Sequence, residues 1–288
     1  MRILILGASG MIGSALFKYL SSMPDLDVLG SVRAHSLENL SSLQHHSSAK
    51  IITDLNISNI ASFKSVLSAI NPDTVINAIG IIKQLPIAND VINLIKLNAL
   101  FPHQLQKICK ENASRLIHIS TDCVYSGYKG YYSEDDVPDP IDLYGKTKAL
   151  GEIYEDAITI RTSTIGYEIK STHGLLEWFL SQKKEVKGYS RAIYSGITSL
   201  ELGKILYKYV IFNNQLQGLY NVSSDSISKY SLLLKIKKIY NSQINIIEDS
   251  EIEINRSLNS RKFRAAVGYH PPSWDEMLFE LRDFKNSL

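Results

Sequence analysis

The sequence has few cysteines, little net charge and no long apolar run. Its two cysteines, Cys109 and Cys123, stand in neither a metal-type nor a redox-pair spacing. A disulfide framework is therefore excluded, and the chain suits a reducing compartment. Lysine and arginine total 31 against 29 aspartate and glutamate residues, a formal net charge of +2. Charge therefore gives no reason to expect a nucleic-acid partner.

Membrane segments are also missing from the sequence. The start of the chain has an apolar run too short for a signal peptide, and the longest later run, residues 75–82, is interrupted by Asn77. Neither run can span a bilayer. We therefore expect a cytoplasmic protein with no membrane partner and no nucleic-acid partner.

What is present is the composition of a globular protein, with 44% hydrophobic and 21% charged residues in a chain of 288. Such a composition excludes disordered, collagenous and fibrous chains. The length corresponds to roughly two domains, or to one large domain with a smaller companion.

Short apolar segments alternate with helical ones up to about residue 162. Strands separated by helices predict an α/β fold with a doubly wound parallel sheet. We expect strands at residues 3–6, 28–32, 51–52, 74–78, 115–120 and 157–161, and helices at 13–23, 58–70, 91–110 and 144–154. In the more irregular second half we expect helices at 175–182, 200–212, 228–240 and 275–284, and a strand at 218–222.

A glycine loop, residues 7–13, joins the first strand to the first helix. Glycine at three positions allows a tight turn and lets backbone N–H groups approach a pyrophosphate at the helix N-terminus. Glycines also serve ordinary turns, but the place between strand and helix favours a dinucleotide cradle. The residues assigned to it are Gly7, Ser9, Gly10, Met11, Ile12 and Gly13.

The second strand is followed by Arg33 and has no acidic residue at its end to bind the 2′-hydroxyl of NAD. A guanidinium suits a 2′-phosphate, so the sequence favours NADP over NAD, with a solvated surface arginine as the plainer alternative. Asp54, after the third strand, could bind the adenine amine or simply begin a turn.

Tyr144 and Lys148 are spaced to lie on one face of an expected helix. A free tyrosine has a pKa of ~10, and lowering it by ~2 to 3 units costs ~3 to 4 kcal/mol. One ammonium at ~4 Å supplies about that much, so we expect Lys148 to lower the pKa of Tyr144. The preceding strand ends at Ser120-Thr121-Asp122, where Thr121 or Ser120 could donate a hydrogen bond to a substrate carbonyl that Tyr144 protonates.

These features follow one another in the order typical of extended short-chain dehydrogenase/reductases: the glycine loop, Asn77-Ala78-Ile79-Gly80, Asn98, Ser120-Thr121-Asp122 and Tyr144 with Lys148. Within that superfamily the chain resembles the dTDP-4-dehydrorhamnose reductase family. The resemblance is carried by residues 116–125, 144–152, 160–163, 218–220 and 255–259.

The resemblance implies NADPH-dependent reduction of a nucleotide-linked 4-keto-6-deoxy sugar, in deoxysugar biosynthesis for surface polysaccharide. NADPH would deliver hydride to C4, with NADH as an alternative cofactor. Tyr144 would donate the proton, Lys148 would lower its pKa and bind the nicotinamide ribose, and Thr121 would polarise the carbonyl. Asn98 would orient the lysine. The resemblance adds Leu55, Ala78, Ile79, Gly80 and Asn98 to the cofactor residues, and it makes Thr121, Asp122 and Arg256 substrate contacts.

For Asp122 and Arg256, a buried structural pair is an equally good interpretation. No metal site is assigned. We expect residues 1–163 to form an NADP-binding Rossmann domain, to which segments of 192–222 return. Residues 164–288 are expected to form a smaller substrate-binding region.

Cys123 stands where related 4,6-dehydratases carry a glutamate base. A thiol with a pKa of ~8.5 is a poor substitute, so dehydration is disfavoured. A nucleotide-sugar epimerase and a non-catalytic NADP-binding regulatory subunit remain as alternatives, and the resemblance also allows a homodimer.

Overall fold

A computed structural model of the chain describes residues 1–33, 50–53, 55–83, 90–169 and 171–286. At its centre is a seven-stranded sheet with the order β11-β6-β5-β4-β1-β2-β3, in which all neighbours run parallel. The strands are β1 (Arg2–Leu6), β2 (Asp27–Ser31), β3 (Lys50–Ile52), β4 (Thr74–Asn77), β5 (Arg115–Thr121), β6 (Ile158–Thr162) and β11 (Gly218–Asn221). The predicted Rossmann-type doubly wound fold is confirmed.

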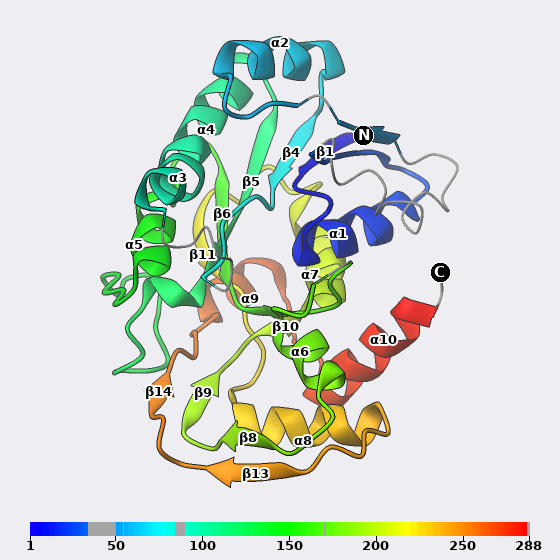
Figure 1. Cartoon of the computed structure of the whole chain (residues 1–288). Helices are drawn as coiled ribbons and strands as arrows, with labels where there is room; N and C mark the ends of the chain where they lie inside the picture. The colour runs from blue at the N-terminus through cyan, green and yellow to red at the C-terminus, as the bar shows by residue number, and fades with distance from the viewer. Residues whose placement is uncertain (34–49, 54, 84–89, 170, 287–288) are drawn as a thin grey trace.

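Both faces of this sheet are covered by helices (Figure 1). In β1, Ile3 and Ile5 belong to one apolar cluster and Leu4 and Leu6 to the other, and all four are fully buried. The first cluster includes residues of α1 (Met11–Ser21) and α7 (Ser199–Ile205), and the second includes residues of α2 (Ile60–Ile70) and α4 (Phe101–Glu111). Burial on both faces is why these strands are continuous apolar runs.

The later part of the chain builds a second group of elements beyond the carboxyl ends of the strands (Figure 1). Its short strands pair as β10-β7, β12-β9-β14 and β13-β8. Within it the chain returns to the main sheet, where β11 pairs with β6 and α7 packs against α1. The domain boundary near residue 163 stays a prediction. In the described part of the chain no helix is long and apolar enough to cross a membrane.

The elements of this second group lie between residues 164 and 286. They are β7 (Thr164–Ile165), α6 (Leu175–Ser181), β8 (Val186–Tyr189), β9 (Ala192–Tyr194), β10 (Ile197–Thr198), β12 (Ile227–Ser228), α8 (Lys229–Ile239), β13 (Ile246–Asp249), β14 (Ile254–Asn255), α9 (Arg261–Val267) and α10 (Trp274–Asn286).

Three predicted helices differ from the observed ones. The helix expected over 200–212 consists of α7 and the π-helical segment η5 (Leu206–Val210). The helix expected over 91–110 consists of α3 (Val91–Leu94), the π-helical segment η3 (Ile95–Leu100) and α4. The helix expected over 144–154 is α5 (Leu143–Leu150), which ends early because the chain turns at Gly151 and buries Glu152. The sequence pattern also missed the short strands β8, β9, β12, β13 and β14, whose partners are distant in the chain.

A buried ion pair lies behind the carboxyl edge of the sheet. Arg161 in β6 donates two hydrogen bonds to the Glu152 carboxylate, at 2.7 and 2.6 Å, and both side chains are 1% exposed or less. The carboxylate also accepts from the hydroxyls of Ser120 (2.7 Å) and Tyr154 (3.2 Å), and Arg161 donates to the Tyr125 hydroxyl (2.5 Å). These bonds tie β5, β6 and the end of α5 together.

The Arg161→Met variant should unfold far more easily than the wild type. Removing the guanidinium leaves a buried carboxylate without a counter-charge, which costs about 3 to 5 kcal/mol. We expect the free energy of unfolding, from denaturant titration, to fall by about that amount, and a second change, Glu152→Gln, to restore part of it. The matched control is Lys110→Met, which breaks an exposed ion pair with Asp156 and should leave the titration nearly unchanged. Equal unfolding of Arg161→Met and Lys110→Met would contradict this prediction.

Candidate active site

The carboxyl ends of the central strands open into one cleft of about 760 Å³, which the second group of elements closes from the other side. In doubly wound sheets this edge is where ligands bind. The predicted site residues that line the cleft are Ser9, Gly10, Met11, Ile12, Arg33, Ala78, Gly80, Thr121, Asp122, Tyr144 and Arg256.

The glycine loop has the backbone shape that a pyrophosphate cradle needs. Gly7 has a φ of 85°, and a Cβ on Gly13 would lie 2.1 Å from the Gly7 carbonyl oxygen, closer than any side chain allows. Helix α1 begins at Met11 without a side-chain cap on Gly10, so its first N–H groups can receive an anion. Gly7 and Gly13 shape this cradle without lining the cleft.

The other predicted cofactor residues differ in where they lie. Arg33 is exposed and lines the cleft just beyond β2. Asp54 lies outside the described residues. Leu55 and Ile79 pack against the apolar cluster on the α2 side of the sheet and do not line the cleft.

Asn98 is buried in η3 and fixes the segment that follows β4. Its amide oxygen accepts a hydrogen bond from the Ile81 N–H (2.9 Å), and its amide nitrogen donates to the Ile81 carbonyl (3.0 Å). The same nitrogen lies 3.4 Å from the Thr147 hydroxyl in α5. Among the described residues its bonds do not include Lys148, so Asn98 aligns α5 with the loop after β4 and does not hold the lysine side chain directly.

Tyr144 and Thr121 meet because α5 begins very close to the end of β5. Asp142 caps the helix by accepting a hydrogen bond from the Gly145 N–H (2.7 Å). A Cβ on Gly145 would lie 2.2 Å from the Cys123 carbonyl oxygen, so this approach requires glycine. Both side chains then line the cleft, and the Thr121 hydroxyl donates to the Asp122 carboxylate (3.2 Å) and accepts from the Cys123 N–H (3.1 Å).

The pKa of Tyr144 differs from the sequence-based expectation. Burial raises this pKa above its usual value, and Cys123, Asp122 and Asp142 raise it further, while the polar influence of Thr121 lowers it. Lys148 is not among the main groups that shift the pKa of Tyr144. The tyrosine is therefore held in its protonated form, and the expectation that its pKa is lowered is wrong for this structure.

The position of the Lys148 side chain explains why the pKa of Tyr144 is not lowered as the sequence predicted. Its side chain is buried on the inner face of α5, and the ammonium donates a hydrogen bond to the Ile119 carbonyl in β5 (2.8 Å). Burial lowers the pKa of Lys148 to about 8, and the nearby Glu152 carboxylate acts in the opposite direction. A buried ammonium needs an acceptor, and here the strand supplies it.

Asp122 and Arg256 both line the cleft. Burial raises the pKa of the Asp122 carboxyl, against the pull of the positive charges on Lys229 and Arg256. The guanidinium of Arg256 donates to the Tyr125 carbonyl (2.8 Å) and lies 3.7 Å from the Cys123 sulfur. Arg256 and Asp122 form no ion pair with each other. The buried structural pair that the sequence left open as an interpretation is therefore not formed.

The cleft residues that the sequence did not single out include Lys83, Tyr194 and Lys229. Lys229 directly follows the N-cap of an amphipathic helix, where a lysine normally faces solvent, so no local pattern singles it out. In the described part of the chain, no three His, Cys, Asp or Glu side chains are grouped as they would be around a metal ion.

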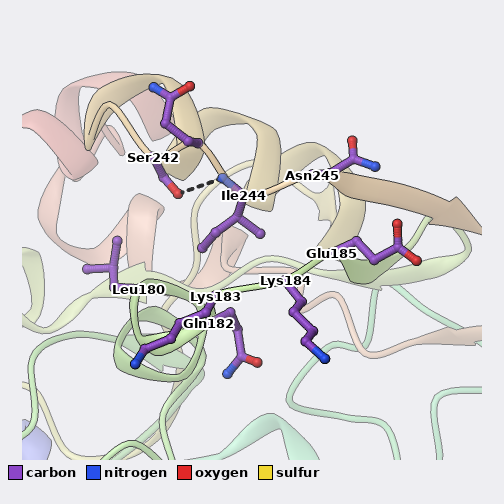
Figure 2. A pocket seen from close by; sticks show the side chains of 9 residues that line it. Leu180, Gln182, Lys183, Lys184, Glu185, Ser242, Ile244 and Asn245 are labelled. Carbon is purple, nitrogen blue, oxygen red and sulfur yellow. Dashed lines mark hydrogen bonds between the residues drawn. The ribbon is translucent and has the colours of Figure 1, made fainter.

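A second cavity, of about 430 Å³, lies between residues 182–185 and 242–245, with Leu180 also in its lining. It contains none of the predicted site residues. Figure 2 shows that the charged ends of Lys184 and Glu185 point in different directions. Because its polar groups do not converge, this cavity is not the candidate site.

Known proteins resemble the chain in sequence and in fold. The model of the RmlD substrate binding domain matches residues 1–186. The dTDP-4-dehydrorhamnose reductase of Aggregatibacter actinomycetemcomitans is 24% identical and covers 98% of this chain and 99% of its own length. Methionine adenosyltransferase 2 subunit beta of Danio rerio is 27% identical over 52% of this chain and 42% of its own length.

Among solved structures, the dTDP-4-dehydrorhamnose reductase of Bacillus anthracis, in complex with NADP, has the same fold. Its TM-score is 0.79 at 21% identity, and the match covers 98% of each chain. The residues matched by the family model include the glycine loop, Thr121, Tyr144 and Lys148. The chain therefore belongs to the RmlD substrate binding domain family of extended short-chain dehydrogenase/reductases, which confirms the predicted family and the predicted class of NAD(P)-dependent oxidoreductase.

Proposed function

We propose that this protein is an NADPH-dependent reductase of a nucleotide-linked 4-keto-6-deoxy sugar, in deoxysugar biosynthesis for surface polysaccharide. The observation that carries the proposal is a protonated tyrosine, Tyr144, which lines the same cleft as Thr121 and the glycine loop and whose hydroxyl is under the influence of Thr121. The full-length match to a dTDP-4-dehydrorhamnose reductase supports this substrate class.

The residues of the cleft fit a nicotinamide dinucleotide. The glycine loop and the uncapped start of α1 would hold the pyrophosphate, and Arg33 at the end of β2 would hold the 2′-phosphate of NADP. When bound, the cofactor supplies the hydride. The preference for NADPH over NADH is part of the proposal and depends on Arg33.

In a reduction, the carbonyl oxygen gains negative charge and must then take a proton. Tyr144 donates this proton, and its raised pKa keeps the proton on the phenol until the oxygen becomes more basic. The Thr121 hydroxyl, which donates to the Asp122 carboxylate in this structure (3.2 Å), turns to donate to the same oxygen in the proposed reaction.

The Tyr144→Phe variant should lose turnover because its ring has no proton to donate. We expect NADPH oxidation with a nucleotide-linked 4-keto-6-deoxy sugar to slow by about 100-fold or more, the usual share of a general acid. Affinity for NADPH, measured by calorimetry, should stay unchanged. The control is Tyr128→Phe, since Tyr128 is 87% exposed and lies outside the cleft. Turnover by Tyr144→Phe at the wild-type rate would remove Tyr144 from the chemistry.

The Arg33→Ala variant tests the choice of cofactor. Loss of charge-assisted hydrogen bonds to the 2′-phosphate should weaken NADPH binding by about 10- to 100-fold and leave NADH binding unchanged. The matched control is Arg2→Ala, which removes an exposed arginine at the opposite end of β1. The role assigned to Arg33 fails if both variants bind the two cofactors as the wild type does.

A non-catalytic NADP-binding subunit is a second candidate, supported by the partial match to methionine adenosyltransferase 2 subunit beta. Tyr144 and Lys148 favour catalysis. A wild-type chain that binds NADPH but does not oxidise it with any nucleotide-linked 4-keto sugar would favour the subunit. An epimerase would instead convert its substrate without net consumption of NADPH. The homodimer and the cytoplasmic location stay predictions.

A further inference from the structure

Lys229 is a lysine in the cleft whose ammonium has no hydrogen-bonding or ionic partner among the described residues. It is the first residue of α8, and Ser228 caps that helix by accepting from the Ser231 N–H (3.0 Å). The contact of the ammonium is with the ring of Tyr194, 3.6 Å from the ring centroid. The positive charge is thus held over an aromatic face and left without an anion.

Lys229 is partly buried, and the fully buried cations Lys148 and Arg161 are satisfied by the protein itself. The Lys148 ammonium donates to the Ile119 carbonyl, and the Arg161 guanidinium is paired with Glu152. A buried charge is costly unless it is paired, and an unpaired one in a cleft marks a candidate ligand contact. Lys229 therefore differs from the structural cations.

The surroundings of Lys229 are rich in positive charge. Lys83 and Arg256 act on it as like charges, and Asp122 and Cys123 are the acidic groups that face it. Asp122 attracts the ammonium without forming an ion pair with it, and it is also attracted by Arg256. Three cations against one carboxylate leave this end of the cleft positively charged.

Tyr194 adds an independent sign of a ligand. It is 4% exposed and lines the cleft, and its hydroxyl is buried without a hydrogen-bond partner among the described residues. Such orphaned groups are uncommon in folded proteins. An oxygen-bearing ligand group beside Lys229 would satisfy the hydroxyl and the ammonium together.

We propose that Lys229, assisted by Arg256 and the Tyr194 hydroxyl, binds an oxyanion of the nucleotide-sugar substrate. The oxyanion is a phosphate of the nucleotide linkage or a carboxylate on the sugar, which share this chemistry. The inference rests on the proposed function, since it takes the occupant to be a nucleotide sugar. The cofactor pyrophosphate is not the occupant proposed here, because the proposed function assigns it to the glycine loop and the start of α1.

The titration of Lys229 supports this assignment. Burial lowers its pKa to about 8, Asp122 and Cys123 raise it, and Lys83 and Arg256 lower it. A bound oxyanion favours the charged ammonium and so raises this pKa. Binding near pH 8 should therefore be accompanied by proton uptake, which calorimetry in buffers of different ionisation enthalpy measures.

The test compares Lys229→Met, Lys229→Arg and, as the matched control, Lys238→Met, which removes an exposed lysine of the same helix. Binding of dTDP, thymidine, UDP-glucuronate and UDP-glucose to the NADPH-loaded protein is measured by calorimetry. Lys229→Met should weaken binding of the oxyanion-bearing probe by about tenfold or more and abolish the proton uptake. Lys229→Arg should recover part of the affinity, and Lys238→Met should behave as the wild type does.

The probes separate the two sources of the oxyanion. If Lys229 binds the phosphates, the Lys229→Met variant binds dTDP more weakly than the wild type does, and its affinity for thymidine is unchanged. If Lys229 binds a sugar carboxylate, the Lys229→Met substitution weakens the binding of UDP-glucuronate more than that of UDP-glucose, and the affinity for dTDP is unchanged. Equal affinity of wild type and Lys229→Met for every probe, including no binding by either, overturns the proposal. This experiment measures binding and not turnover, so its outcome is independent of the reductase assay. A protein that binds these probes but does not oxidise NADPH would refute the proposed reductase and leave the Lys229 site in place.

Discussion

The buried pair of Arg161 and Glu152 is the interaction on which the cleft depends. Glu152 fixes the end of α5, the helix that carries Tyr144, and accepts from Ser120 beside Thr121. Arg161 donates to the Tyr125 hydroxyl, and the carbonyl of Tyr125 receives the Arg256 guanidinium. One charge pair therefore connects the helix of Tyr144, the end of β5 and Arg256.

The same burial that makes this pair costly sets the protonation of the site. Tyr144 stays protonated because a phenolate would be poorly solvated among Cys123, Asp122 and Asp142. A reductase needs a tyrosine that carries its proton at the start of the reaction, so the raised pKa agrees with reduction. Lys148 and Lys229, both with a pKa lowered to about 8, keep most of their positive charge at neutral pH.

Motifs whose function lies within one short segment could be read from the sequence. The glycine loop needs only a strand, a turn and the start of a helix, and the spacing of Tyr144 and Lys148 follows from the helix period. The apolar runs of the central strands also predicted the doubly wound sheet, since burial on both faces leaves a clear pattern. These predictions use contacts between residues that are near neighbours in the chain.

Other features depend on contacts between distant segments, and no local pattern shows them. Helix α5 ends at Leu150 because Glu152 must reach Arg161, and the Lys148 ammonium faces the Ile119 carbonyl because α5 packs on β5. Lys229 enters the cleft only because α8 begins beside β9. The amino-acid sequence by itself determined the family and the fold class, and it predicted the residues of the cradle. Only the tertiary structure decided which charges are buried, and hence their protonation and partners, because desolvation depends on everything packed around a group.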